Sequence, residues 1–195
     1  MCSSDLAESG LRVLISHSMG VHLLPPALLA EAERVVLLAG FGRFVPAGKA
    51  GRPLRAALAG MAAALAEGPD PAETALRCQR LLRDFLVQAA APDPADGLPA
   101  GPADKPVAEA ARQRLRRDLA LLEACQDLPA AFPDRVPVLL VEAGADRIVV
   151  PAARQELRQR LPHADRILLP DTGHAFLSAP PLAPVLQWLE RNAAP

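Results

Sequence analysis

Short apolar runs alternate with segments of helical periodicity toward both ends of the chain. The apolar runs, which predict buried β-strands, are residues 11–16, 35–39, 138–142 and 166–169. Segments with helical spacing follow at residues 21–32, 151–161 and 180–191. Strands that alternate with helices through short connections form parallel sheets. The pattern therefore predicts an α/β fold with a mainly parallel sheet of four strands.

The middle of the chain has a different pattern. Between the second and third strands, apolar residues recur at helical spacing in residues 53–66, 72–90 and 107–126, and loops rich in proline and glycine separate these segments. We expect residues 41–133 to form a helical lid. Residues 11–40 and 134–195 would then form the core, and residues 1–10 a non-native or disordered leader.

Composition limits the class of protein. A chain of 195 residues that is 51% hydrophobic fits one domain, and its net charge of -1 argues against nucleic acid as a partner. No apolar run is long enough to span a membrane, and no signal peptide is visible. The three cysteines, Cys2, Cys78 and Cys125, lack the spacing of a metal site. We expect a cytoplasmic protein without metal or cofactor.

A five-residue turn, Ser16-His17-Ser18-Met19-Gly20, joins the first strand to the helix after it. A serine between two small residues at such a turn is typical of a nucleophile elbow. The turn would expose the Ser18 hydroxyl and direct the Met19 N–H at an oxyanion. The alternative interpretation is an ordinary turn in which Ser18 caps the helix.

Two further residues complete a candidate triad. Asp146 follows the third strand and His174 follows the fourth, so parallel strands would bring both to the same sheet edge as Ser18. The order Ser, Asp, His suits this fold. Asp171 is the competing acid, and Asp146 paired with Arg147 on the surface is the alternative without catalysis.

From Arg12 onward the chain resembles the α/β-hydrolase superfamily, and within it the pimeloyl-[acyl-carrier-protein] methyl ester carboxylesterases of biotin synthesis (the BioH-like group). The elbow SHSMG, the segment GADR before VVP, and the segment LPHA before HAFLSAP carry the resemblance. It implies a serine carboxylesterase for an acyl methyl ester, with acyl carrier protein as a partner. A general small-ester hydrolase or acyltransferase of the same fold, and a non-catalytic binding protein, are the alternatives.

Several features depart from that family. Ser16 stands where the family has glycine, and Pro25 and Pro26 interrupt the helix after the elbow. Only 17 residues precede Ser18, whereas the family has four strands there and a loop that supplies the second oxyanion donor. We therefore expect an N-terminally truncated chain that lacks this donor and is inactive by itself.

The lid supplies the remaining candidate residues. Arg77, Arg80 and Arg83 recur every three residues and would present a basic face to an acidic carrier protein. A solvated helix face is the alternative. We expect His17, Phe41 and Phe85 to contact the substrate.

Overall fold

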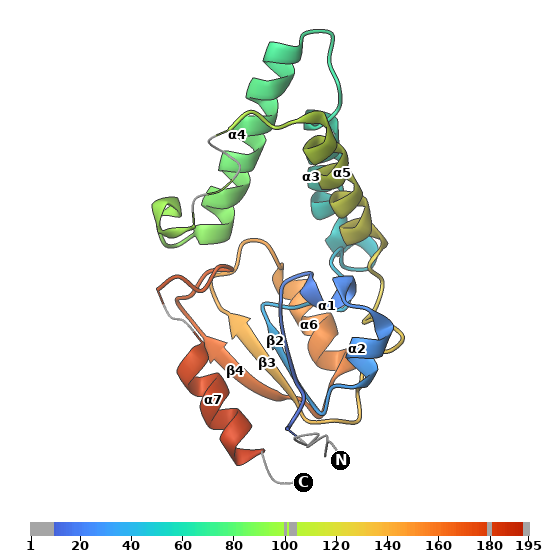
Figure 1. Cartoon of the computed structure of the whole chain (residues 1–195), viewed down its shortest axis with the longest axis vertical. Coiled ribbons are helices and arrows are strands. Elements are labelled where there is room, and N and C mark those ends of the chain that lie inside the picture. The colour runs from blue at the N-terminus through green and yellow to red at the C-terminus, as the bar shows by residue number, and fades with distance from the viewer. Residues whose placement is uncertain (1–9, 100, 102–104, 179–180, 193–195) are drawn as a thin grey trace, which may run out of the picture.

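The computed structural model describes residues 10–99, 101, 105–178 and 181–192. The expected leader lies outside these residues except for Gly10. A sheet with helices on both faces forms the lower part of the molecule, and three long helices rise above it (Figure 1).

The sheet carries the strands that the apolar runs predicted. Its strands are β1 (Val13–His17), β2 (Arg34–Leu38), β3 (Val138–Ala143) and β4 (Asp165–Leu169). They pair in that order and all run parallel. The predicted α/β fold with a parallel sheet is thereby confirmed. All four carboxyl ends reach one edge, where a fold of this kind places its site.

Helices bury the two faces of the sheet. The first face is covered by α1 (Gly20–Leu23), α2 (Pro26–Ala30) and α6 (Pro151–Arg160), and the second by α7 (Leu182–Arg191) (Figure 1). Leu37 and Leu140 pack on the first face, and Val36 and Leu139 on the second, as side chains alternate along each strand. Trp188 of α7 is 2% exposed and its Nε1 donates to Asp165 at 2.7 Å.

The two prolines after the elbow divide the expected helix, as predicted. Leu24 adopts an extended backbone with ψ of 142°, and Pro26 begins a new helix. A residue before proline is driven out of the helical region because the proline ring clashes with its backbone.

Three helices form the insertion between β2 and β3. They are α3 (Arg52–Ala64), α4 (Pro71–Ala90) and α5 (Glu109–Ala124), at the positions that helical spacing predicted. Short 3-10 turns precede α3, at η1 (Gly48–Gly51), and follow α4, at η2 (Ala95–Gly97). We call this insertion the lid. No helix in the described part of the chain has the length and apolarity needed to cross a membrane.

Candidate active site

The turn after β1 has the backbone of a nucleophile elbow. Ser18 has a φ of +55°, in the left-handed region that non-glycine residues rarely adopt, and its N–H donates to the Leu38 carbonyl at 2.9 Å. A Cβ on Gly20 would lie 2.8 Å from Ser16 Oγ. Both flanking positions must therefore be small. The capping alternative for Ser18 fails, because Met19 occupies the N-cap position of α1 and no side chain caps that helix.

Asp146 and His174, on the loops after β3 and β4, are joined by a hydrogen bond. His174 Nδ1 lies 2.9 Å from Asp146 Oδ2, and both side chains are buried. Because an ionised carboxylate only accepts, Nδ1 carries the proton and Nε2 is left as the basic nitrogen. The other oxygen, Asp146 Oδ1, accepts from the N–H groups of Ile148 at 2.7 Å and Val149 at 3.0 Å. These bonds hold the carboxylate in one orientation.

The competing assignments fare worse. Arg147 is exposed and makes no ion pair with Asp146, so the surface-pair interpretation does not describe this loop. Asp171 is exposed on the same loop as His174, and no hydrogen bond joins the two. Of the two acids weighed from the sequence, the structure brings Asp146 to the imidazole.

Backbone hydrogen bonds join the loop that carries Asp146 to the loop that carries His174. The N–H of Gly144 donates to Leu169 at 2.8 Å, and that of Ala145 donates to Thr172 at 3.0 Å. A Cβ on Gly144 would lie 2.2 Å from the Pro170 carbonyl oxygen. The two loops therefore pack at backbone distance.

The lid touches the loop that carries His174. The N–H of Ala175 donates to the Ala89 carbonyl at 3.1 Å. In Figure 1 the lower end of α4 comes down onto this edge of the sheet. The lid therefore contacts the loop of His174 as well as lining the cavity above Ser18.

A cavity of about 580 Å³ lies between the elbow and the lid. Ser18 and Met19 line its floor, Arg147 and Ile148 line it from the acid loop, and lid residues that include Phe85 supply its mainly apolar wall. No hydrogen bond among the described residues joins the Ser18 hydroxyl to His174. Ser18 thus opens onto a mainly apolar chamber.

Of the three residues expected to contact the substrate, one lines the cavity above Ser18 and two do not. Phe85 lines the cavity, whereas Phe41 and His17 do not. Phe41 is fully buried, where it stacks on the His22 ring with centroids 5.0 Å apart. The apolar segment after β2 thus contributes Phe41 to the core rather than to the site.

The basic face expected on α4 is also divided. The Arg77 guanidinium donates to the carbonyls of Ala64 at 2.9 Å and Ala66 at 2.6 Å, so it ties α4 to the end of α3. Arg80 and Arg83 are exposed. Only these two of the three predicted partner residues point their charge to solvent.

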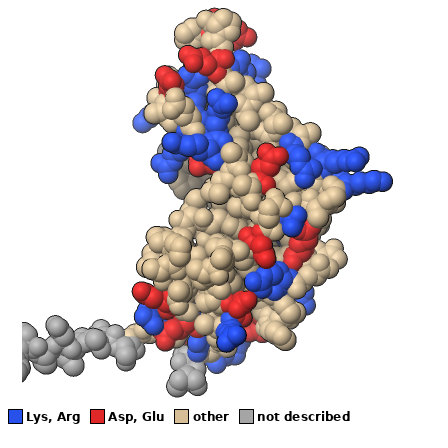
Figure 2. All heavy atoms as spheres, turned by 90° about the vertical axis from the view of Figure 1, so that its right-hand side faces the viewer, with Lys and Arg blue, Asp and Glu red and all other residues tan. Residues whose placement is uncertain are grey.

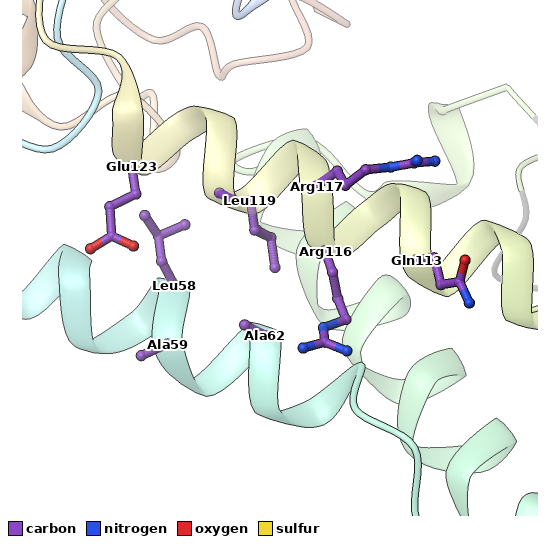
Figure 3. A pocket seen from close by; sticks show the side chains of 9 residues that line it. Leu58, Ala59, Ala62, Gln113, Arg116, Arg117, Leu119 and Glu123 are labelled. Atoms are coloured by element: carbon purple, nitrogen blue, oxygen red, sulfur yellow. The ribbon is translucent and has the colours of Figure 1, made fainter.

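A second hollow of about 470 Å³ lies on the lid between α3 and α5 (Figure 3). Small apolar residues such as Ala59 and Ala62 line it, together with Arg116, Arg117 and Glu123. None of Ser18, Asp146 and His174 lines it, whereas Ser18 lines the cavity between the elbow and the lid, which is therefore the candidate site. No three described His, Cys, Asp or Glu side chains are grouped as a metal site requires.

Comparisons with known proteins agree with this geometry. The model of the "Alpha/beta hydrolase family" matches residues 3–187, and the chain belongs to that family. No curated protein shows a matching sequence.

Solved structures share the fold at low identity. The α/β hydrolase MGS-M2 from a Medee basin deep-sea metagenome library matches with a TM-score of 0.59 and 14% identity over 95% of this chain and 66% of that one. The esterase RhEst1 from Rhodococcus sp. ECU1013 has a TM-score of 0.50 and 19% identity over 93% of this chain. BioG from Haemophilus influenzae has a TM-score of 0.55 and 18% identity over 91% of this chain and 73% of its own. The chain spans 65% of the length of RhEst1.

Proposed function

We propose that this hydrolase is a serine carboxylesterase in which Ser18 is the nucleophile, His174 the general base and Asp146 the orienting acid. The observation that carries the proposal is the buried bond of 2.9 Å between His174 Nδ1 and Asp146 Oδ2. This bond engages Nδ1 and leaves Nε2 as the ring nitrogen available to a general base. The strained φ of Ser18 supports the assignment of the nucleophile.

The chemistry follows from these roles. His174 Nε2 takes the hydroxyl proton as Ser18 Oγ forms a bond to the ester carbonyl carbon. The Met19 N–H stabilises the oxyanion, and the alkoxide leaves with the proton from His174. Water then attacks the acyl-enzyme by the same route and restores Ser18. Asp146 stabilises the imidazolium in both steps.

For the substrate we propose an acyl methyl ester, with pimeloyl-[acyl-carrier-protein] methyl ester as the specific candidate. The apolar wall of the cavity above Ser18 supports an acyl chain. Basic side chains gather on the lid in the view of Figure 2. Such a surface suits an acidic carrier protein, and Arg80 and Arg83 add exposed charge on α4.

The triad is tested in protein that restores the strands expected before β1, by labelling with a fluorophosphonate probe and by hydrolysis of p-nitrophenyl esters. Ser18→Ala should abolish labelling, and Asp146→Asn should lower kcat by roughly 10⁴-fold. Asp171→Asn is the matched control and should retain activity, because its side chain does not reach His174. Labelling that persists in Ser18→Ala, or a greater loss in Asp171→Asn than in Asp146→Asn, would contradict the proposal. Absence of labelling in protein that carries the strands and the second oxyanion donor expected before β1 would favour the binding-protein alternative.

The carrier-protein proposal needs its own substitution. Arg80→Glu with Arg83→Glu should lower kcat/KM for a methyl ester on carrier protein and leave that for the free methyl ester unchanged. Arg166→Glu with Arg191→Glu is the control, because it makes the same change of charge on exposed residues of β4 and α7, outside the lid. Equal loss with both substrates, or with both pairs of substitutions, would remove the support for a carrier protein.

A further inference from the structure

His17 joins the elbow to the loop of the base. Its Nε2 lies 2.9 Å from the carbonyl oxygen of His174. A carbonyl oxygen only accepts, so His17 Nε2 carries the hydrogen and donates. The side chain next to the nucleophile is therefore bonded to the main chain of the residue that must deprotonate it.

Ring contacts reinforce this bond. The His17 and His174 rings lie 4.8 Å apart between centroids, and the His17 and Phe176 rings lie edge to face with centroids 6.0 Å apart. Because His17 does not line the cavity above Ser18, it is placed to act on the loop and not on the substrate.

The loop that it holds is strained. Phe176, two residues after His174, has a φ of +52°, which is costly for an aromatic residue and persists only where neighbours hold the backbone. Its side chain is 7% exposed and packs with Trp188 and Val185. The loop is therefore fixed in the core behind His174, by Ala89 of the lid, and by His17 from the elbow.

The charge state of His17 fits the same role. Burial of the ring against its neighbours lowers the pKa of His17, and the carbonyl bond only partly opposes this. A neutral His17 leaves His174 free to become an imidazolium, since a second cation so near would oppose it. Among the groups that face His17, His174 and Asp146 are the ones that titrate.

We propose that His17 is a positioning residue that holds the loop of the His174 imidazole beside the elbow by donating a hydrogen bond to the His174 carbonyl. The effect on turnover rests on the proposed esterase function. The effect on the geometry of His174 does not, and it is measured separately.

The test compares two substitutions. His17→Leu removes the donor at similar volume, and His17→Gln keeps an N–H donor near the position of Nε2. In p-nitrophenyl ester hydrolysis, His17→Leu should lower kcat by roughly 10²-fold, the loss that a displacement of about 1 Å produces. The KM of His17→Leu should stay unchanged, because His17 does not line the cavity. His17→Gln should retain most of the kcat of the unaltered protein. An equal fall in kcat in both variants, or a rise in KM in place of a fall in kcat, would overturn the proposal.

A second measurement does not need turnover. The Nδ1 proton of His174, bonded to Asp146, should give a downfield proton resonance whose exchange with water is slow in the unaltered chain and in His17→Gln. In His17→Leu the resonance should broaden or exchange faster, because the loop is released. If the unaltered chain shows the resonance but the protein with the restored strands hydrolyses no ester, the esterase function fails while this test still stands. An unchanged resonance in a folded His17→Leu, or in His17→Met should the leucine variant not fold, would overturn the proposal.

Discussion

Gly173 lies so close to Ala91 that a Cβ on Gly173 would be 1.9 Å from the Ala91 carbonyl oxygen. Gly173 precedes the proposed base, and Ala91 follows the last turn of α4 directly. The lid and the loop of His174 therefore meet at backbone distance.

We predict that Gly173→Ala displaces the His174 loop from the lid. The forced overlap should lower the free energy of unfolding by about 1–3 kcal/mol, the usual cost of overpacking. It should also slow fluorophosphonate labelling, because His174 moves away from Ser18. Gly60→Ala in α3 is the control, since a Cβ there meets no atom within 4 Å. It should raise the free energy of unfolding by about 0.5–1 kcal/mol, as alanine favours a helix interior. Unchanged labelling in a folded Gly173→Ala would show that the contact does not position the base.

The Ser16 hydroxyl supports a prediction about stability. Ser16 Oγ is buried and has no hydrogen-bond partner. Ser16→Ala should raise the free energy of unfolding in urea by about 1 kcal/mol, since a buried hydroxyl without a partner costs about that much. In the opposite direction, Gly20→Ala brings a Cβ within 2.8 Å of this oxygen and should destabilise the chain.

A double variant tests the same packing. Gly20→Ala should cost less in a Ser16→Gly background than in the unaltered chain, because the opposing side chain is gone. Additive effects of the two substitutions would refute the idea that they compete for one space.

Features that depend on residues near one another in the sequence were predictable, whereas contacts between distant residues were not. The apolar runs predicted β1 to β4, because a buried parallel strand leaves a local signature. The order of Ser18, Asp146 and His174 at strand ends also placed them at one edge. The partner of Arg77 was not predictable in this way, since it depends on how the end of α3 packs on α4. The bond of His17 to the His174 carbonyl spans 157 residues, and no local pattern encodes it.

Two histidines should make the folded state sensitive to acid. Burial lowers the pKa of both His17 and His22 below the ordinary value of 6.5. The unfolded chain then takes up protons first as the pH falls, so stability is complete above about pH 6.5 and declines below it. Urea unfolding between pH ~8 and ~5 should show this slope. The slope should be smaller in His17→Gln with His22→Gln, and unchanged in the exposed control His163→Gln. An equal slope in all three chains would assign the acid sensitivity to other groups.

The last prediction concerns the free side of β1. Among the described strands β1 pairs only with β2, so no described strand pairs with its other side. Ile15 on this strand is 53% exposed. An open edge with an apolar side chain favours pairing with another chain. We expect the chain of residues 1–195 to self-associate in sedimentation experiments and Ile15→Lys to reduce this association. Leu76→Lys is the matched control, because Leu76 is 63% exposed on the lid helix α4 and lies on no strand edge. If the unaltered chain is monomeric, or if the two substitutions reduce association equally, the β1 edge does not drive association.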